Sequence, residues 1–244
     1  MPNVEAASPR DLQREPLDLI QDMNRNLAAT PGAPEAVDGV IKSYELGFRM
    51  QDTVPALLDI SNEPQSVLDA YGVKSGPWGS FARQCLMTRR LNEAGMRFVE
   101  IRQPGWDHHA NLHQGVIDQC CMIDQPTGAL LTDLKQRGLL DETLVLFGSE
   151  FSRLPMSQGT DGRDHNIPGY SMFLAGAGVK KGFSYGATDD IGMKAVDGRM
   201  HVNDLHATLL ALMGLDHKEL TYGYAGRNFR LTDVAGVVQP QIFA

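Results

Sequence analysis

The histidines of this chain are confined to one part of it, and several of them lie beside acidic residues. All seven histidines lie within residues 108–217, and the first 107 residues contain none. Two short segments, 107–109 and 164–165, combine imidazole with carboxylate. These two groups are the usual protein ligands of zinc, manganese and iron. The pattern therefore predicts a metal site built from the part of the chain that follows residue 106.

The candidate ligands with the clearest spacing are Asp107, His109, Asp164 and His165. Asp107 and His109 are separated by one residue of an expected loop, so both side chains can point at one cation. The alternative for this run is a solvated polar loop. Asp164 and His165 lie in an irregular glycine-rich segment, where the alternative is a turn held by Asp164 beside an incidental histidine. We favour metal ligation in both places.

Three further residues have more than one interpretation. Glu150 is expected at the end of a buried strand, where a carboxylate is costly unless it is paired or bound to metal. Arg153 could form that pair, or it could bind the oxyanion of a phosphate or sulfate substrate. His206 lies in the first turn of an expected helix and could be another ligand or could orient one.

The bulk composition is that of an ordinary globular protein. Of the 244 residues, 42% are hydrophobic and 21% are charged, and the net charge is −8. This acidic balance argues against general nucleic-acid binding, which favours basic surfaces. The three cysteines have no disulfide-like spacing and are expected to be thiols. We expect no membrane span and see no signal peptide in this chain.

Hydrophobic periodicity and turn residues predict a series of alternating elements. Helices are expected at 17–27, 34–59, 80–94, 113–137 and 203–213, and strands at 96–101, 143–147 and 170–175, with a loop at 61–79. Strands that alternate with helices predict an α/β fold with a largely parallel sheet flanked by helices. In such sheets, sites gather beyond the carboxyl ends of the strands, where Asp107 and Glu150 would both lie. Residues 1–33 are expected to be a polar lead-in to a domain spanning 34–244.

Several stretches of the chain, in this order, carry a family resemblance. They are YELGFRMQ (44–51), RQCLMTRRLNEAGMRFVEI (83–101), GWDHH (105–109), RGLLDETLVLFGSEFSRLP (137–155), GRDHN (162–166), AGAGVKKGFSYGATDDIG (175–192) and HVNDLHATLLALMGLDH (201–217). From about residue 17 onward the chain resembles the bacterial family catalogued as domain of unknown function 1501, DUF1501. That family belongs with the sulfatases and alkaline phosphatases.

The resemblance implies a fold, a cofactor and an activity. It implies an alkaline-phosphatase-like α/β sheet that binds divalent metal (zinc, manganese or calcium) and hydrolyses sulfate or phosphate esters. Asp107 and His109 look like an early metal-binding pair of that superfamily, and His165 looks like a later metal histidine. Glu150 stands where the superfamily has a metal aspartate. Phe151 follows it where a histidine or asparagine is expected, and a phenyl ring cannot ligate.

The resemblance also implies that part of the domain lies outside this chain. Family members are similar to longer chains whose N-terminal portion carries the first strand and the nucleophile, and full-length relatives are expected to be exported to the bacterial periplasm. Residues 34–244 are thus expected to be the C-terminal part of the domain. The expected substrate is a small-molecule or carbohydrate ester. Two alternatives are a non-catalytic metal- or carbohydrate-binding relative and a half-domain that needs a missing segment or partner chain.

Overall fold

The computed structural model describes residues 8–32, 36–74 and 80–244. The chain divides into two compact units. The first runs to Asp69 and includes Leu86–Glu100, and the second consists of Ala70–Cys85 and Ile101–Ala244.

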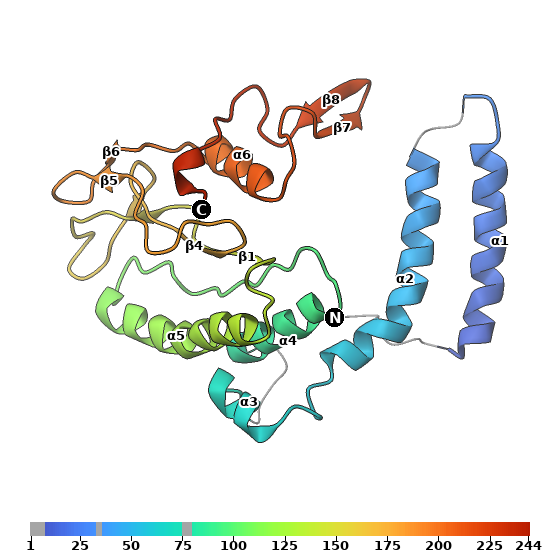
Figure 1. Cartoon of the computed structure of the whole chain (residues 1–244), viewed down its shortest axis with the longest axis horizontal. Helices are drawn as coiled ribbons and strands as arrows, with labels where there is room; N and C mark the ends of the chain where they lie inside the picture. Colours follow the sequence, from blue (N-terminus) through green and yellow to red (C-terminus); the bar gives the residue numbers. More distant parts are fainter. Residues whose placement is uncertain (1–7, 33–35, 75–79) are drawn as a thin grey trace. The chain divides into compact units, whose positions relative to one another are not determined.

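Helices dominate the described part of the chain, and the strands are short (Figure 1). The helices are α1 (Arg10–Ala28), α2 (Ala36–Leu58), α3 (Gln65–Tyr71), α4 (Phe81–Glu93), α5 (Leu112–Gln136), α6 (Val202–Leu212) and the 3-10 helix η1 (Pro240–Ile242). The strands are β1 (Leu144–Phe147), β2 (Ser152–Arg153), β3 (His165–Asn166), β4 (Phe173–Gly176), β5 (Ala187–Thr188), β6 (Ala195–Asp197), β7 (Thr221–Tyr224) and β8 (Arg227–Arg230).

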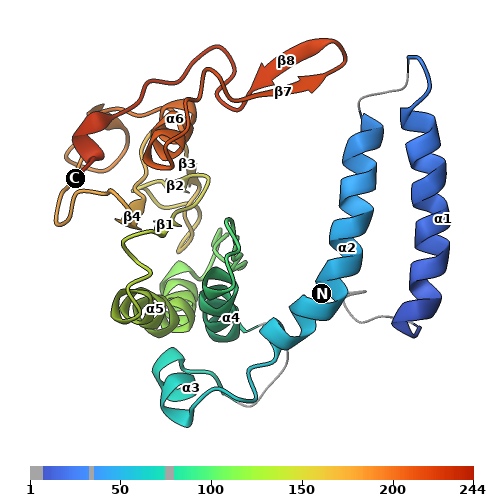
Figure 2. The same cartoon turned by 45° about the vertical axis from the view of Figure 1, so that its right-hand side comes forward.

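In the first unit, α1 and α2 lie side by side as a helical pair (Figures 1 and 2). The side chain of Gln21 is fully buried between them, and its amide nitrogen donates a 2.8 Å hydrogen bond to the Ile41 carbonyl. Arg14 on α1 forms a two-pronged ion pair with Glu45 on α2, at 3.0 and 3.1 Å. These polar contacts fix the register of the pair, since a buried amide without a partner would be costly.

A buried ion-pair network also stabilises the first unit. Glu63 accepts hydrogen bonds from Arg89 at 2.7 Å and from Arg90 at 2.5 Å, and the side chains of Glu63 and Arg89 are almost completely buried. Desolvation by itself would raise the pKa of Glu63. The hydrogen bonds and charges of the two arginines outweigh that effect, so the pKa of Glu63 is lowered and the carboxylate stays ionised.

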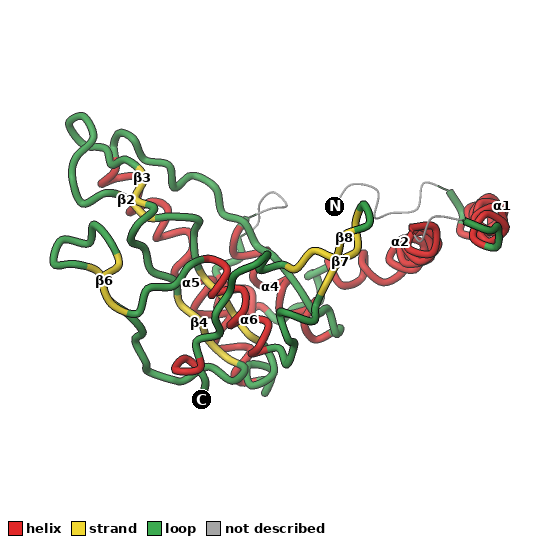
Figure 3. Tube along the Cα trace, turned by 90° about the horizontal axis from the view of Figure 1, so that it is seen from above, coloured by secondary structure: helices red, strands yellow, loops and turns green. Residues whose placement is uncertain are grey.

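The second unit packs its core around α5 and α6. Leu130 and Leu134 of α5 are buried, and the Tyr71 hydroxyl, also buried, donates a 3.0 Å hydrogen bond to Asp133 of α5. On α6, Ala207 and Leu210 are buried. Between these elements the chain is mostly loop, with the short strands at intervals (Figure 3).

Four of the predicted helices are confirmed within two residues of their expected ends, as α2, α4, α5 and α6, whereas α1 begins at Arg10 and not at the expected residue 17. The Ser80 hydroxyl accepts from the Arg83 amide at 3.2 Å and so caps α4, which ends before Gly95. Gly95 and Gly138, after α4 and α5, have φ angles of 84° and 72°. Left-handed glycine is a common helix stop. The strand predictions at 143–147 and 170–175 correspond to β1 and β4.

The predicted fold class is wrong. Every described sheet has two strands, and each pairing is antiparallel: β1 with β4, β2 with β3, β5 with β6, and β7 with β8. The alternating pattern predicted parallel strands joined by crossover helices. The expected crossover helix is present as α5, but segment 96–101, the strand that it would join to β1, forms no strand. Strand β1 pairs instead with β4, to which the chain returns through loops and short strands, and the pairing is antiparallel. The described residues therefore form no alkaline-phosphatase-like parallel sheet.

Several local predictions also need correction. Segment 96–101 forms no strand, and Met96 and Phe98 are solvent-exposed, because hydrophobic alternation makes a strand only where a partner is available. Helix α3 lies inside the expected 61–79 loop, of which 75–79 fall outside the described residues. The expected domain boundary at 33/34 also falls outside them. None of the helices described is long and apolar enough to cross a membrane.

The three cysteines should differ sharply in reactivity. Cys85 is buried, and burial raises the pKa of its thiol to about 12, whereas Cys120 and Cys121 are exposed on α5. Since the thiolate is the reactive form, Cys85 should not react at pH 8. We expect an aromatic disulfide reagent to titrate two thiols in the folded protein and the third after denaturation. Rapid reaction of all three without denaturant would contradict the buried position of Cys85.

Candidate metal centre

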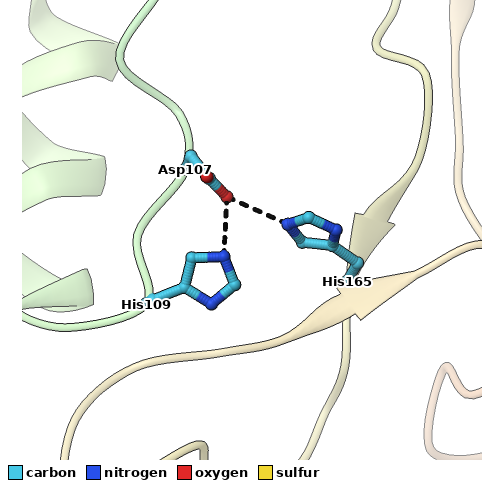
Figure 4. A group of neighbouring side chains, drawn as sticks. All are labelled: Asp107, His109 and His165. Atoms are coloured by element: carbon cyan, nitrogen blue, oxygen red, sulfur yellow. Dashed lines mark hydrogen bonds and ion pairs between the residues drawn. The ribbon is translucent and has the colours of Figure 1, made fainter.

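Two imidazoles converge on one carboxylate oxygen in the second unit. His109 Nε2 and His165 Nε2 each lie 3.0 Å from Asp107 Oδ1 (Figure 4). One potential ligand atom from each of these three residues lies within 4.8 Å of the other two. This is the one group of its kind among the residues that the structure describes. The two segments singled out in the sequence, 107–109 and 164–165, therefore do meet in space.

The β2–β3 ladder determines which side chains reach Asp107. Strands β2 and β3 lie side by side (Figure 3), and in their antiparallel pairing Arg153 is directly opposite His165. Directly opposed residues of an antiparallel pair extend from the same face. Both side chains accordingly contact the same oxygen, Asp107 Oδ1. The next hydrogen bond of the ladder, from the Leu154 amide to the Asp164 carbonyl at 2.9 Å, extends the pairing.

Arg153 is the main electrostatic partner of Asp107. Its Nη2 donates to Asp107 Oδ1 at 2.5 Å and to the Trp106 carbonyl at 3.1 Å, and its Nη1 donates to the Arg163 carbonyl at 3.3 Å. The hydrogen bonds from Arg153 and then from His165 lower the pKa of Asp107 to about 2. Asp107 is thus a carboxylate at any physiological pH, which is the form that binds metal.

Two glycines bring the loop that carries Asp107 and His109 into place. A Cβ on Gly115 of α5 would overlap the ring of His108, so His108 packs against the helix and does not join the cluster. A Cβ on Gly162 would overlap the carbonyl oxygen of His109. Close backbone approach of this kind is available only to glycine. The Arg163 amide adds a 3.1 Å hydrogen bond to the His108 carbonyl.

The two histidine rings are also held by neighbouring side chains. Phe151 stacks on His165, with ring centroids 4.2 Å apart and the planes inclined by 28°. Gln158 Oε1 lies 2.6 Å from His109 Nδ1. The rings of His109 and His165 are themselves 5.0 Å apart. Phe151, which cannot ligate, therefore supports the face of a candidate ligand.

The other predicted ligands are placed outside this group. Glu150 accepts from Ser149 Oγ at 2.9 Å, and its pKa is lowered by a hydrogen bond from its own amide, by Ser149, and by the charges of Arg153 and His165. Asp164 Oδ1 accepts from the His165 amide at 2.8 Å. His206 lies within α6, half-buried. None of these three belongs to the group of mutually close ligand atoms that the described residues form.

Sequence reasoning missed three contributions to the site. Arg153 was expected to pair with Glu150 or to bind an oxyanion, and it hydrogen-bonds Asp107. Gln158 and Gly162 carried no signal, because their roles depend on how the 158–162 turn packs against the 105–110 loop. The antiparallel register of Arg153 and His165 was hidden by the parallel sheet that was expected.

Comparison with known proteins places the chain in a family. The family model for "Protein of unknown function (DUF1501)" matches residues 3–242, and the chain therefore belongs to the DUF1501 family. Neither the comparison with curated proteins nor that with solved structures found a match. The expected family membership is confirmed. Placement of the family with the sulfatases and alkaline phosphatases stays a proposal, as does the view that this chain is only the C-terminal portion of the domain.

Proposed function

We propose that this protein binds a divalent metal ion through Asp107, His109 and His165 and hydrolyses sulfate or phosphate esters there. The observation that carries the proposal is the convergence of the two Nε2 atoms on Asp107 Oδ1 at 3.0 Å. Two imidazoles and a carboxylate are the ligand set of many catalytic metal sites, which keep further positions open for water or substrate.

The three residues fit a metal ion in size as well as in type. Zinc–ligand distances of about 2.0–2.1 Å in tetrahedral geometry place neighbouring ligand atoms about 3.3 Å apart. The two Nε2–Oδ1 separations of 3.0 Å are close to that value, and all three ligand atoms lie within 4.8 Å of one another. Nitrogen donors favour zinc, manganese or iron over calcium, which takes six to eight oxygen ligands.

A metal ion at this position would supply Lewis-acid polarisation of an ester oxygen. The remaining chemistry falls to the chain itself. The Asp107 side chain is 68% exposed, and the side chains of His109 and His165 are 40% and 38% exposed, so a bulky ester can reach them. Arg153 makes three hydrogen bonds to oxygens of the protein. A guanidinium has five donors, and the two that remain could hold a sulfate or phosphate oxygen.

A second candidate is a relative that binds metal without turnover. Phe151 at an expected ligand position and the commitment of Arg153 to Asp107 favour it. A protein of this kind would keep the three ligands and lack a nucleophile. It would bind zinc or manganese with the same residues and release no product from any ester.

Assays with aryl phosphate and aryl sulfate esters separate the two candidates. We expect metal-reconstituted protein to release the phenol, and His165→Ala to lower that rate at least about tenfold, because loss of one ligand weakens the metal site. His113→Ala is the matched control: His113 is exposed in the first turn of α5, and its removal should leave the rate unchanged. Metal-loaded wild type that releases no phenol would favour the second candidate.

A further inference from the structure

A cleft in the second unit is lined by residues of helix α5 and of the β1–β4 ladder, and it shares no residue with the candidate metal centre. Its volume is about 320 Å³, and its lining includes Phe147 of β1, Phe173 of β4 and, on α5, Cys120, Cys121 and Asp124. Small-molecule sites usually have volumes of about 300–1,000 Å³ and mostly apolar walls with a few polar groups. The cleft therefore has the size and the kind of lining of a site for a small ligand.

Two stacked phenyl rings form one wall of this cleft. Phe147 and Phe173 are directly opposite in the antiparallel ladder, so both side chains extend from the same face. Their ring centroids are 4.9 Å apart and the planes differ by 6°. The two residues nevertheless remain 36% and 39% exposed. Apolar ring surface is thus left in contact with water, and an aromatic ring bound in the cleft would cover it.

The opposite wall carries a single charge. Cys120, Asp124 and Thr127 follow one another at helical spacing, so one face of α5 lines the cleft. Asp124 is the one charged residue among the described residues of the lining, and no other described residue forms an ion pair or a hydrogen bond with its carboxylate. A cation would meet an attractive charge here, whereas an anion would be repelled. We propose that the cleft binds a small amine whose aromatic body packs on the phenyl rings and whose ammonium group pairs with Asp124.

Three soluble ring compounds of similar size test the proposal: benzylammonium, benzyl alcohol and benzoate. Titration of the full chain at neutral pH, followed in ¹H–¹⁵N spectra, gives the three affinities. Benzylammonium should bind about three- to fivefold more tightly than benzyl alcohol, because an exposed ion pair contributes up to about that factor, and benzoate should bind most weakly. Asp124→Asn should abolish the preference for benzylammonium over benzyl alcohol. Asp118→Asn, at an exposed carboxylate on the same helix that Gln114 bonds, is the matched control and should keep that preference.

The phenyl wall is tested separately from the charge. Phe173→Ala should weaken the binding of benzylammonium and benzyl alcohol alike, by at least about threefold, because both lose the same aromatic contact. Phe173→Leu keeps an apolar side chain in the strand and should weaken both ligands less. A Phe173→Ala variant that binds both compounds as wild type does would contradict the proposed packing.

The two thiols of the lining give a second readout. Cys120 and Cys121 are exposed and line the cleft, so a bound amine should shield them. When half of the chains are occupied, alkylation of both thiols by iodoacetamide should slow about twofold. Binding that leaves this alkylation rate unchanged would place the amine elsewhere and overturn the proposal. Absence of binding, equal affinities for benzylammonium and benzyl alcohol, or a preference that survives Asp124→Asn would overturn it as well.

Discussion

Replacing Asp107 by alanine should weaken metal binding at least about 100-fold and leave the protein folded. Asp107 Oδ1 is the atom on which His109, His165 and Arg153 all converge, so its removal takes away both the anionic ligand and the centre of the cluster. Loss of a residue that only supports a ligand costs about 10- to 100-fold in metal affinity, and loss of the charged ligand itself should cost more. Calorimetric titration with zinc measures the change.

Two variants make the Asp107 result specific. Asp107→Asn keeps the shape of the side chain and one oxygen but loses the charge, so its affinity should fall between those of Asp107→Ala and wild type. Asp190→Ala removes an exposed carboxylate outside the cluster and should bind zinc as wild type does. Equal zinc affinity in wild type and Asp107→Ala would show that the ion binds elsewhere.

Replacing Gly162 by alanine should lower both the stability of the protein and its zinc affinity, although Gly162 is not one of the three candidate ligands. The new Cβ would overlap the carbonyl oxygen of His109, which is backbone and can move away only with the loop that carries Asp107 and His109. We expect the free energy of unfolding to fall by about 2 kcal/mol or more, as for overpacking in general. We also expect zinc affinity to fall at least tenfold. Denaturant unfolding and zinc titration of the same sample give both values.

Gly128→Ala is the matched control for that substitution. Gly128 lies within α5, and a Cβ there would meet nothing within 4 Å. Alanine should therefore leave zinc binding unchanged and stabilise the protein by up to about 1 kcal/mol through its helix propensity. If Gly162→Ala, like Gly128→Ala, lowered neither the free energy of unfolding nor the zinc affinity, that result would contradict the close packing of the 158–162 turn against His109.

The cluster was partly predictable because ligand chemistry is visible in residue types. Asp107, His109 and His165 could be selected from an acidic–imidazole pattern, and the structure brings these three together. Glu150 and Asp164 fit the same pattern, yet their carboxylates bond Ser149 and the His165 amide. Short-range spacing cannot distinguish a carboxylate that reaches a shared centre from one that bonds its chain neighbour.

The fold was less predictable because strand direction depends on distant partners. The run at 143–147 marks a strand in either a parallel or an antiparallel sheet, and only its pairing with β4 decides which. Helix boundaries were easier, since Ser80, Gly95 and Gly138 act locally. The cap of α6 was an exception. Its N-cap is His201, whose ring accepts a hydrogen bond from the Asn203 amide, and histidine is not one of the usual N-cap residues.

Metal content after dialysis is the most direct test of the proposed site. Protein reconstituted separately with zinc, manganese, iron and calcium should be dialysed and analysed for each element, beside a variant in which Asp107, His109 and His165 are all alanine. We expect wild type to retain one ion of zinc, manganese or iron per chain, and the triple variant to retain none. Wild type that retains no metal, or a triple variant that retains as much as wild type, would contradict the proposal that these three residues form a metal centre.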